Sequence, residues 1–159
     1  MTIETGQPIP EATFTTMTED GPAPLSTADV FANKTVVLFA VPGAYTPTCS
    51  AKHMPSFTKN LDAIKAKGVD TVACTSVNDV FVMDAWGKAE GAGDVMMLAD
   101  GNGDFARAVG LTMDASSFGM GERSQRYAMI VKDGTVDQVF VEAPGEYKVS
   151  SGEHVLDHL

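Results

Sequence analysis

The amino-acid sequence predicts a single α/β domain in which helices flank a mixed central sheet, with an extension at the N-terminus. Between residues 35 and 110, apolar segments rich in β-branched residues alternate with segments of helical periodicity, which is typical of strands connected by helices. Later in the chain, Asp133-Gly134 joins two further apolar segments and is a strong signal for an antiparallel hairpin. A chain of 159 residues can bury about 70% of its unfolded surface in one domain, and no repeat or linker divides residues 1–159.

The first part of the chain is rich in proline and threonine. Residues 6–30 predict irregular structure or a small hairpin followed by a turn at Asp20-Gly21. Residues 35–41, TVVLFAV, are continuously apolar, and they predict a strand that is buried on both faces.

A long helix is predicted to follow this strand. From Pro47 to about Lys67, apolar residues recur every three to four positions, and Gly68 then ends the pattern. Pro55 lies inside the segment and predicts a kink, because proline cannot donate the backbone hydrogen bond of a helix.

The middle of the chain repeats the alternation of strand and helix. Residues 69–77 predict a second buried strand, after which Asn78 or Asp79 can cap a helix. Residues 95–98 predict a short strand, and residues 104–109 a short helix.

The last third of the chain predicts a hairpin and a terminal helix. Residues 126–132 and 135–142 flank Asp133-Gly134 as paired strands, and Ser150 with Glu153 has the spacing of a capping box. The resulting order, β-α-β-α followed by β-β-α, is that of a thioredoxin-like fold with additions.

The charge balance argues against one broad class of function. Eleven Lys and Arg residues against 21 Asp and Glu residues give a net charge of −10, the wrong sign for binding phosphates, so no nucleic-acid partner is expected. No apolar run approaches the roughly 18 residues of a membrane span. The N-terminal residues lack the pattern of a secretory signal, and we expect a cytoplasmic protein.

The two cysteines, Cys49 and Cys74, are too few for a disulfide framework or a four-thiolate metal site. The cysteines therefore give no sign of such a framework or of such a metal site. Each cysteine is either a small buried residue or a reactive nucleophile, and the local sequence distinguishes the two.

Cys49 is predicted to lie in the first turn of a helix. Proline is favoured at the first helical position, which places Pro47 there, Thr46 at the N-cap and Cys49 two residues after Pro47. The free N–H groups and the dipole at this end of a helix favour negative charge. The placement therefore favours a reactive thiolate at Cys49.

A thiolate that attacks a peroxide needs hydrogen-bond donors, because negative charge develops on the departing oxygen. The hydroxyl of Thr46 and the backbone N–H of Cys49 are candidate donors on the same turn. Arg126 begins a predicted strand, and the topology can bring it across the sheet as a fixed cation. Arg107 and Arg123 are the other two arginines.

Four segments resemble a known family over nearly the whole chain: PGAYTPTCSAKHMPSF, VNDVFVMDAW, DGNGDFARAVGL and SQRYAMIVKDG. They are similar to the peroxiredoxins of the atypical peroxiredoxin-5, or type II, subfamily. The motif P-x-x-x-T-x-x-C of that family matches Pro42, Thr46 and Cys49 position by position.

The resemblance implies an enzyme that reduces hydrogen peroxide and alkyl hydroperoxides through a cysteine sulfenic acid, without a cofactor. It implies that Cys49 is the peroxidatic cysteine, that Thr46 and Arg126 orient and polarise the peroxide, and that Pro42 shields the sulfenate. The family often forms homodimers, and by analogy residues 116–122 would lie near the interface with Phe118 as the apolar anchor.

A second thiol must reduce the sulfenic acid. Cys74 is predicted in the middle of a buried strand, 25 positions after Cys49, and a disulfide needs Cα atoms within roughly 7 Å. We therefore favour an external reductant, either glutathione with glutaredoxin or thioredoxin. Cys74 stays open as a resolving cysteine because some type II relatives carry a cysteine in this strand.

Alternatives from other classes stay open. A thioredoxin- or glutaredoxin-like disulfide oxidoreductase is disfavoured because Thr46 stands where the first cysteine of C-x-x-C would be. A peroxide-sensing relay protein, or a binding protein with an unreactive Cys49, differs from an enzyme by its lack of turnover. The catalytic interpretation requires a sulfur that an oxidant can reach.

Several residues also have simpler interpretations. Arg126 could form a surface ion pair, and His53 could be the base of a cysteine hydrolase, although no orienting Asn or Asp is evident. The segment from Asp100 to Asp104 lacks the later residues of a calcium loop and is interpreted as a turn and helix cap.

Overall fold

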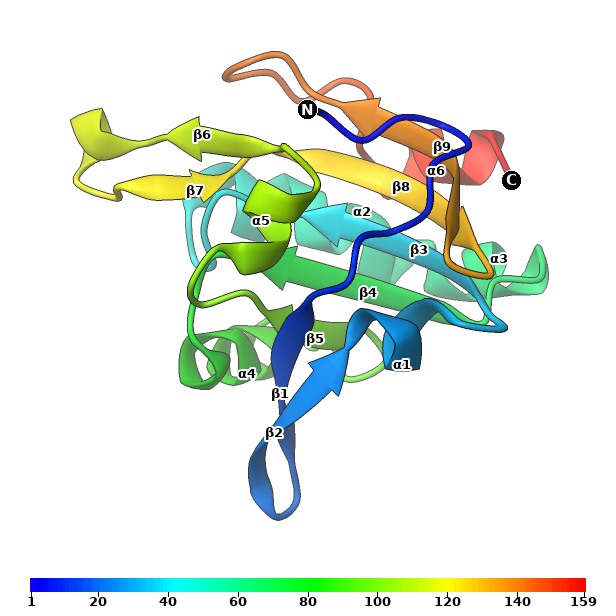
Figure 1. Cartoon of the computed structure of the whole chain (residues 1–159), viewed down its shortest axis with the longest axis horizontal. Helices are drawn as coiled ribbons and strands as arrows, with labels where there is room; N and C mark the ends of the chain where they lie inside the picture. Colours follow the sequence, from blue (N-terminus) through cyan, green and yellow to red (C-terminus); the bar gives the residue numbers. More distant parts are fainter.

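The computed structural model describes residues 1–159 and shows a mixed α/β domain of thioredoxin-like fold built on a seven-stranded sheet (Figure 1). The strands are β1 (Thr13–Thr18), β2 (Gly21–Ser26), β3 (Thr35–Ala40), β4 (Thr71–Ser76), β5 (Met96–Ala99), β6 (Thr112–Asp114), β7 (Glu122–Ser124), β8 (Tyr127–Lys132) and β9 (Thr135–Val141). The helices are α1 (Thr27–Phe31), the π-helix η1 (Cys49–His53), α2 (Met54–Lys59), α3 (Leu61–Ala66), α4 (Val80–Ala89), α5 (Asp104–Ala108), the 3-10 helix η2 (Ser116–Phe118) and α6 (Gly152–Asp157).

The central sheet is mixed, as predicted. Its strand order is β2-β1-β5-β4-β3-β8-β9, in which β3 pairs parallel to β4 and β4 pairs parallel to β5. β8 runs antiparallel to β3, and β9 runs antiparallel to β8. Because β3 and β4 lie in the centre, their residues alternate between two covered faces, which explains their continuous apolar sequences.

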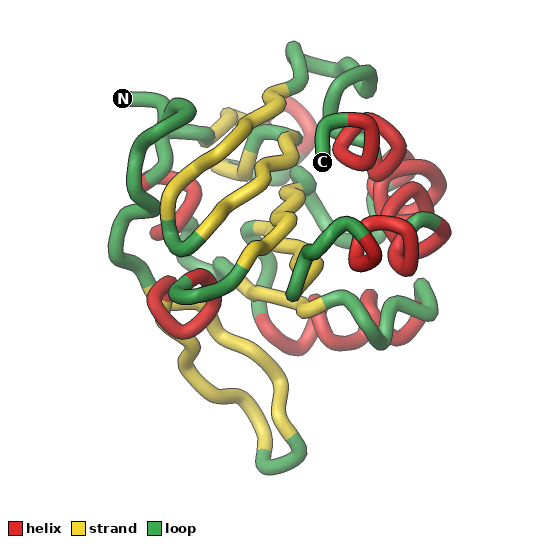
Figure 2. The backbone as a smooth tube through the Cα atoms, turned by 90° about the vertical axis from the view of Figure 1, so that its right-hand side faces the viewer, coloured by secondary structure: helices red, strands yellow, loops and turns green.

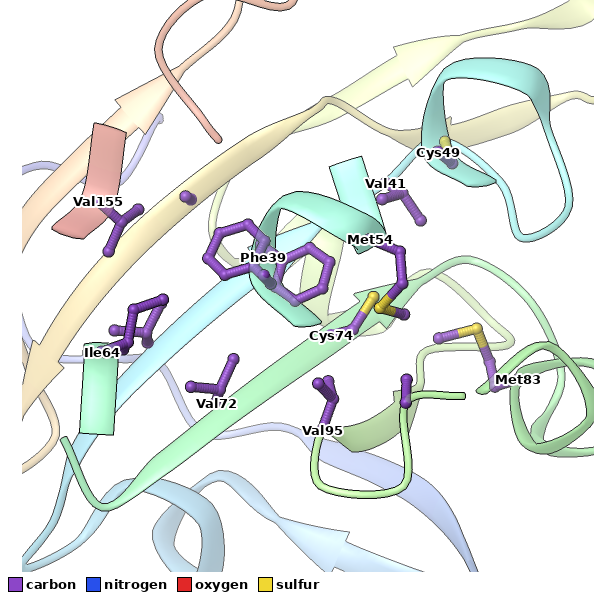
Figure 3. Packing of buried hydrophobic residues seen from close by; sticks show 14 of the residues in the cluster. Phe39, Val41, Cys49, Met54, Ile64, Val72, Cys74, Met83, Val95 and Val155 are labelled. Atoms are coloured by element: carbon purple, nitrogen blue, oxygen red, sulfur yellow. The ribbon is translucent and has the colours of Figure 1, made fainter. Parts of the chain in front are cut away.

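Helices cover both faces of the sheet (Figure 2). On one face, Phe39 of β3 packs in a core cluster with residues of α2, α3, α4 and α6. On the other face, Leu38 packs in a second cluster with residues of α1, α5 and β1. Figure 3 shows the first cluster, with Cys74 inside it and Cys49 at its margin.

The N-terminal extension forms a hairpin that projects from the body of the domain (Figure 1). β1 pairs with β2 from Thr13 opposite Ser26 to Thr18 opposite Gly21, so the turn lies inside the hairpin rather than after it. The short helix α1 follows, with a capping box formed by Ser26 and Asp29. Helix α1 was not predicted, because the prolines of this region obscure its capping signal.

The predicted helix from Pro47 to Lys67 is broken rather than merely kinked. Helical backbone begins at Pro47, but Cys49–His53 forms a π-helix in which the N–H of Met54 donates to the carbonyl of Cys49. The wider turn lies directly ahead of Pro55, where the missing N–H would otherwise leave an α-helical carbonyl without its donor.

A second break separates α2 from α3 at Asn60. The side-chain amide of Asn60 donates to the carbonyl of Ser56 at 2.7 Å, and it thereby replaces the backbone N–H that would continue the helix. This break was not predicted, because a single asparagine inside an apolar periodicity is a weak signal.

The elements near the C-terminus agree with the predictions except at one cap. Asp133 and Gly134 both have positive φ, 48° and 75°, as a two-residue hairpin turn requires. Ser151 rather than Ser150 caps α6, since its side chain accepts from the N–H of His154. The hydroxyl of Ser150 does not cap the helix, because it donates to Glu142 instead.

Two short strands, β6 and β7, form a separate sheet that extends to one side of the domain, with η2 at its tip (Figure 1). These strands were not predicted from the sequence. None of the helices is long and apolar enough to cross a membrane.

Candidate active site

Cys49 lies at the start of the helical segment that follows β3. The N–H of Ser50 donates to the carbonyl of Thr46 at 2.9 Å, so Thr46 is the N-cap residue and Pro47 is the first helical residue, as predicted. Cys49 therefore faces the positive end of the helix, where peptide dipoles favour an anionic sulfur. Trp86 of α4 anchors this turn through a hydrogen bond of 2.9 Å from its Nε1 to the hydroxyl of Ser50.

Arg126 reaches the sulfur of Cys49 from across the sheet. The residue directly precedes β8, the antiparallel neighbour of β3, and its Nη2 lies 3.1 Å from Cys49 Sγ. A guanidinium at this distance stabilises negative charge on the sulfur and on any oxygen bound beside it. The predicted juxtaposition of Cys49 and Arg126 is therefore confirmed, and the interpretation of Arg126 as a surface ion pair is wrong.

His53 holds the other side of the guanidinium. Its Nε2 lies 2.8 Å from the carbonyl of Ser150, and its Nδ1 lies 2.8 Å from Arg126 Nη1. Because a carbonyl only accepts and a guanidinium only donates, Nε2 carries the proton and Nδ1 accepts. Burial, together with the charge of Arg126, lowers the pKa of His53 to about 3. The imidazole is therefore neutral and leaves the positive charge of Arg126 uncompensated.

This geometry argues against a hydrolase with His53 as the general base. The lone pair of Nδ1 is directed at Arg126, while the proton on Nε2 is directed at a backbone carbonyl. A base must accept the proton of its nucleophile, and here the cation of Arg126 is the group in contact with the sulfur. The contact of His53 with Arg126 was not predicted, although the place of His53 four residues after Cys49 was the available signal.

The hydroxyl of Thr46 does not cap the helix. It donates to the carbonyl of Gly43 at 2.7 Å. The loop is instead fixed by Asn78, whose Oδ1 accepts from the N–H of Ala44 at 2.9 Å and from the hydroxyl of Ser76 at 2.6 Å. The hydroxyl of Thr46 is engaged at rest by the tight turn after Gly43, and Thr46 caps the helix through its backbone carbonyl, which accepts from the N–H of Ser50. Asn78, interpreted only as a possible helix cap, was missed as a loop anchor.

Access to the sulfur is closed in this structure. Pro42 and Thr46 are partly exposed, but Cys49 has 0% exposure, contrary to the expectation of a sulfur open to oxidants. The same loop contains Tyr45, a non-glycine residue at φ 66° whose surface is 54% exposed. A small displacement of this loop is therefore needed before peroxide reaches Cys49, and strained residues often mark segments that move.

Cys74 lies in β4 opposite Phe39 of β3 and is fully buried, as predicted. Burial raises the pKa of its thiol well above the usual value. A buried protonated thiol is a poor nucleophile. Both cysteines are free thiols in this structure.

The tip of the β6–β7 sheet reaches the active-site loop. Phe118 is 77% exposed, while Met120 packs over Gly43, where an added Cβ would lie 2.8 Å from the Met120 Cε. Arg123 fastens this tip by donating to the carbonyls of Met120 and Val77, at 2.8 and 3.0 Å.

A family model described as Redoxin matches residues 4–156, which is nearly the whole chain. The chain belongs to the redoxin family. Among redoxins, its relatives are peroxiredoxins, so the resemblance found in the sequence motifs is confirmed.

Three relatives show how close this peroxiredoxin is to known proteins. It is 40% identical to the hybrid peroxiredoxin hyPrx5 of Haemophilus influenzae over 97% of this chain, and it spans 65% of the length of that protein. It is 43% identical to peroxiredoxin-2B of Arabidopsis thaliana, covering 99% of this chain and 98% of the relative. The crystal structure of reduced Prx3 in complex with hydrogen peroxide, from Vibrio vulnificus, has a TM-score of 0.96 at 50% identity and covers 98% of each chain.

Proposed function

We propose that this peroxiredoxin is a thiol-dependent peroxidase in which Cys49 is the group oxidised by peroxide. The observation that carries the proposal is the contact of 3.1 Å between Arg126 Nη2 and Cys49 Sγ at the start of a helix. A helix N-terminus and a cation with no carboxylate partner both favour the thiolate. The same groups also stabilise the negative charge that develops on the departing oxygen when an oxygen–oxygen bond breaks.

The reaction follows from these groups. The thiolate of Cys49 attacks one peroxide oxygen, so a sulfur–oxygen bond forms while the oxygen–oxygen bond breaks. The sulfur is oxidised to a sulfenic acid. The departing oxygen takes a proton from solvent and leaves as water or, from an alkyl hydroperoxide, as an alcohol. Arg126 stays charged throughout and stabilises first the thiolate and then the departing oxygen.

Thr46 acts on the bound peroxide before its oxygen–oxygen bond breaks, and Pro42 acts on the sulfenic acid after it has formed. The hydroxyl of Thr46 donates to the carbonyl of Gly43 at rest, and rotation about its side chain redirects the proton to the bound peroxide. Pro42 follows the buried strand β3 and limits access of water to the sulfenic acid. Hydrogen peroxide as a substrate is supported by the Vibrio vulnificus relative, whose structure contains it.

The reductant is an external thiol, supplied by glutathione with glutaredoxin or by thioredoxin. The burial of Cys74 supports this assignment, because its protonated thiol would have to leave the core before it could attack the sulfenic acid. Cys74 then serves as a small apolar residue of the core rather than as the resolving cysteine.

A homodimer is the proposed assembly, with Phe118 at its interface. The support is the position of this 77% exposed ring on a tip that packs through Met120 against the active-site loop. Large exposed aromatic residues are enriched at the centres of interfaces.

Turnover with a supplied thiol tests this function. With hydrogen peroxide and dithiothreitol, the wild-type protein is expected to consume many equivalents of peroxide, whereas Cys49→Ser consumes none. Cys74→Ser, the matched control, retains most of the activity. A single equivalent consumed by the wild type would favour a sensor over an enzyme, and equal loss in both variants would contradict the assigned roles.

A further inference from the structure

Glu142 is a buried carboxylate that the proposed reaction does not use. It directly follows β9, is 6% exposed and has no Lys or Arg side chain bound to it. Its oxygens accept from the N–H groups of Lys148, Val149 and Ser150 at 2.8, 2.8 and 2.9 Å, and from the hydroxyl of Ser150 at 2.7 Å. Burial alone would raise the pKa of Glu142, but these hydrogen bonds hold it below its usual value.

The loop that Glu142 fastens is in direct contact with the active site. The carbonyl of Ser150 accepts the proton of His53 Nε2 at 2.8 Å, and His53 Nδ1 accepts from Arg126 at 2.8 Å. Tyr147 of the same loop packs on His53, with ring centroids 5.4 Å apart. The backbone N–H of Glu142 also donates to the carbonyl of Arg126 at 3.0 Å. Glu142 therefore holds both the main chain of Arg126 and, indirectly, its side chain.

We propose that Glu142 is a positioning residue that sets the guanidinium of Arg126 on Cys49 through the Ser150 carbonyl and the neutral imidazole of His53. The proposal rests on the proposed peroxidase function. A carboxylate placed directly on Arg126 would fix the guanidinium but would neutralise the charge that the thiolate needs. Two neutral groups between the carboxylate and the guanidinium transmit the geometry while leaving Arg126 cationic.

The hydrogen-bond pattern predicts an order among the variants. Glu142→Ala removes every acceptor and frees the loop. The N–H of Lys148 bonds to both oxygens of Glu142, whereas Val149 and Ser150 bond to one of them. Glu142→Gln keeps one oxygen, which can occupy the place of the shared oxygen, while its amide group replaces the other and opposes the N–H of Lys148. Glu146→Gln is the matched control, because Glu146 lies in the same loop and its carboxylate forms a hydrogen bond only with the Lys148 ammonium, at 3.5 Å.

The test compares three rates in these variants. Stopped-flow fluorescence of Trp86, the single tryptophan, reports oxidation of Cys49 by hydrogen peroxide, since Trp86 is bound to the neighbouring Ser50. Mass spectrometry measures the alkylation of Cys49 and of Cys74 by iodoacetamide. Alkylation does not require a polarised oxygen–oxygen bond, and Cys74 becomes reactive only when the core opens.

The expected result is a selective loss of peroxide chemistry. Glu142→Ala should slow Cys49 oxidation by roughly tenfold to a hundredfold, as a displacement of about 1 Å does. Alkylation of Cys49 should fall less, and Cys74 should stay protected. Glu142→Gln should lie between Glu142→Ala and the wild type, and Glu146→Gln should match the wild type within about twofold.

Two results would overturn the proposal. One is a Glu142→Gln protein that oxidises as fast as Glu146→Gln. The other is a loss of rate that appears only together with alkylation of Cys74, which would make Glu142 a structural residue. If Glu142→Ala does not fold, Glu142→Gln decides between these outcomes. A wild-type protein inert to peroxide would instead refute the proposed function and this inference with it.

Discussion

At the scale of single residues, the active site surrounds one sulfur with groups from distant parts of the chain. The motif around Cys49 was sufficient to predict its place at a helix start, and the predicted topology brought Arg126 close to it. The hydrogen bond between His53 and Ser150 could not be predicted, because Ser150 lies 97 positions further along the chain. The resting hydrogen bond from the Thr46 hydroxyl to the Gly43 carbonyl could not be predicted, because it depends on the shape of one turn.

The neutral state of His53 predicts a loss of stability in acid. Its pKa is about 3 in the folded protein and returns to its ordinary 6.5 on unfolding, so between these values the unfolded chain binds a proton that the folded protein does not. The free energy of unfolding therefore falls as the pH is lowered from 6.5 towards 3, by up to about 1.4 kcal/mol per pH unit from this group.

Urea unfolding of the wild type and of His53→Gln at neutral pH and at pH near 4.5 measures this contribution. The wild type should lose about 2 kcal/mol more than the variant over this interval. Glu142 adds an acid-dependent loss of its own, but it is present in both proteins. Equal losses in the two proteins would contradict a neutral His53.

At the scale of elements, the predictions succeeded where a sequence pattern repeated and failed where a single side-chain contact determines the boundary of an element. The continuous apolar residues of β3 and β4 and the Asp133-Gly134 turn were sufficient to place the centre of the sheet. The break at Asn60 depends on a single side-chain hydrogen bond, which no periodicity reveals. The cap of α6 is Ser151, one residue after the predicted Ser150, because the hydroxyl of Ser150 donates to Glu142.

The junction of α6 with α2 depends on the absence of a side chain at Gly152. The N–H of Gly152 donates to the hydroxyl of Ser56 at 2.9 Å, and a Cβ at Gly152 would overlap with the carbonyl of Ser56. Gly152→Ala should therefore lower the free energy of unfolding by about 1–3 kcal/mol, the usual cost of overpacking.

Gly93→Ala is the matched control for chemical denaturation, because an added Cβ at Gly93 meets nothing within 4 Å. It should change stability by no more than about 0.5 kcal/mol. A Gly152→Ala protein as stable as Gly93→Ala would contradict this, because it would show that a Cβ fits between α6 and α2 without lowering the free energy of unfolding.

At the scale of the whole molecule, the thioredoxin-like α/β fold was predictable, but the small sheet of β6 and β7 was not. Three-residue strands carry too little periodicity to be recognised, and their pairing of Thr112 with Ser124 is formed across a loop. The connection between its strands nevertheless contains Phe118, in η2, whose place near a dimer interface remains a prediction. Its exposure makes it available for association.

Sedimentation velocity over a range of concentrations tests the proposed dimer. Phe118→Glu should weaken association by at least about thirtyfold, since a charge would replace a central aromatic contact. Phe118→Leu keeps an apolar side chain at the same position and should stay closer to the wild type. If all three proteins sediment identically at every concentration, Phe118 lies outside any interface.

The central claim, that the sulfur beside Arg126 is the one that peroxide oxidises, is tested most directly by mass spectrometry of both cysteines. The reduced protein is mixed with one equivalent of hydrogen peroxide in the presence of dimedone, which traps sulfenic acids. The account predicts the adduct on Cys49 and an unmodified thiol at Cys74. An adduct on Cys74, or an unmodified Cys49 after the peroxide has been consumed, would contradict it.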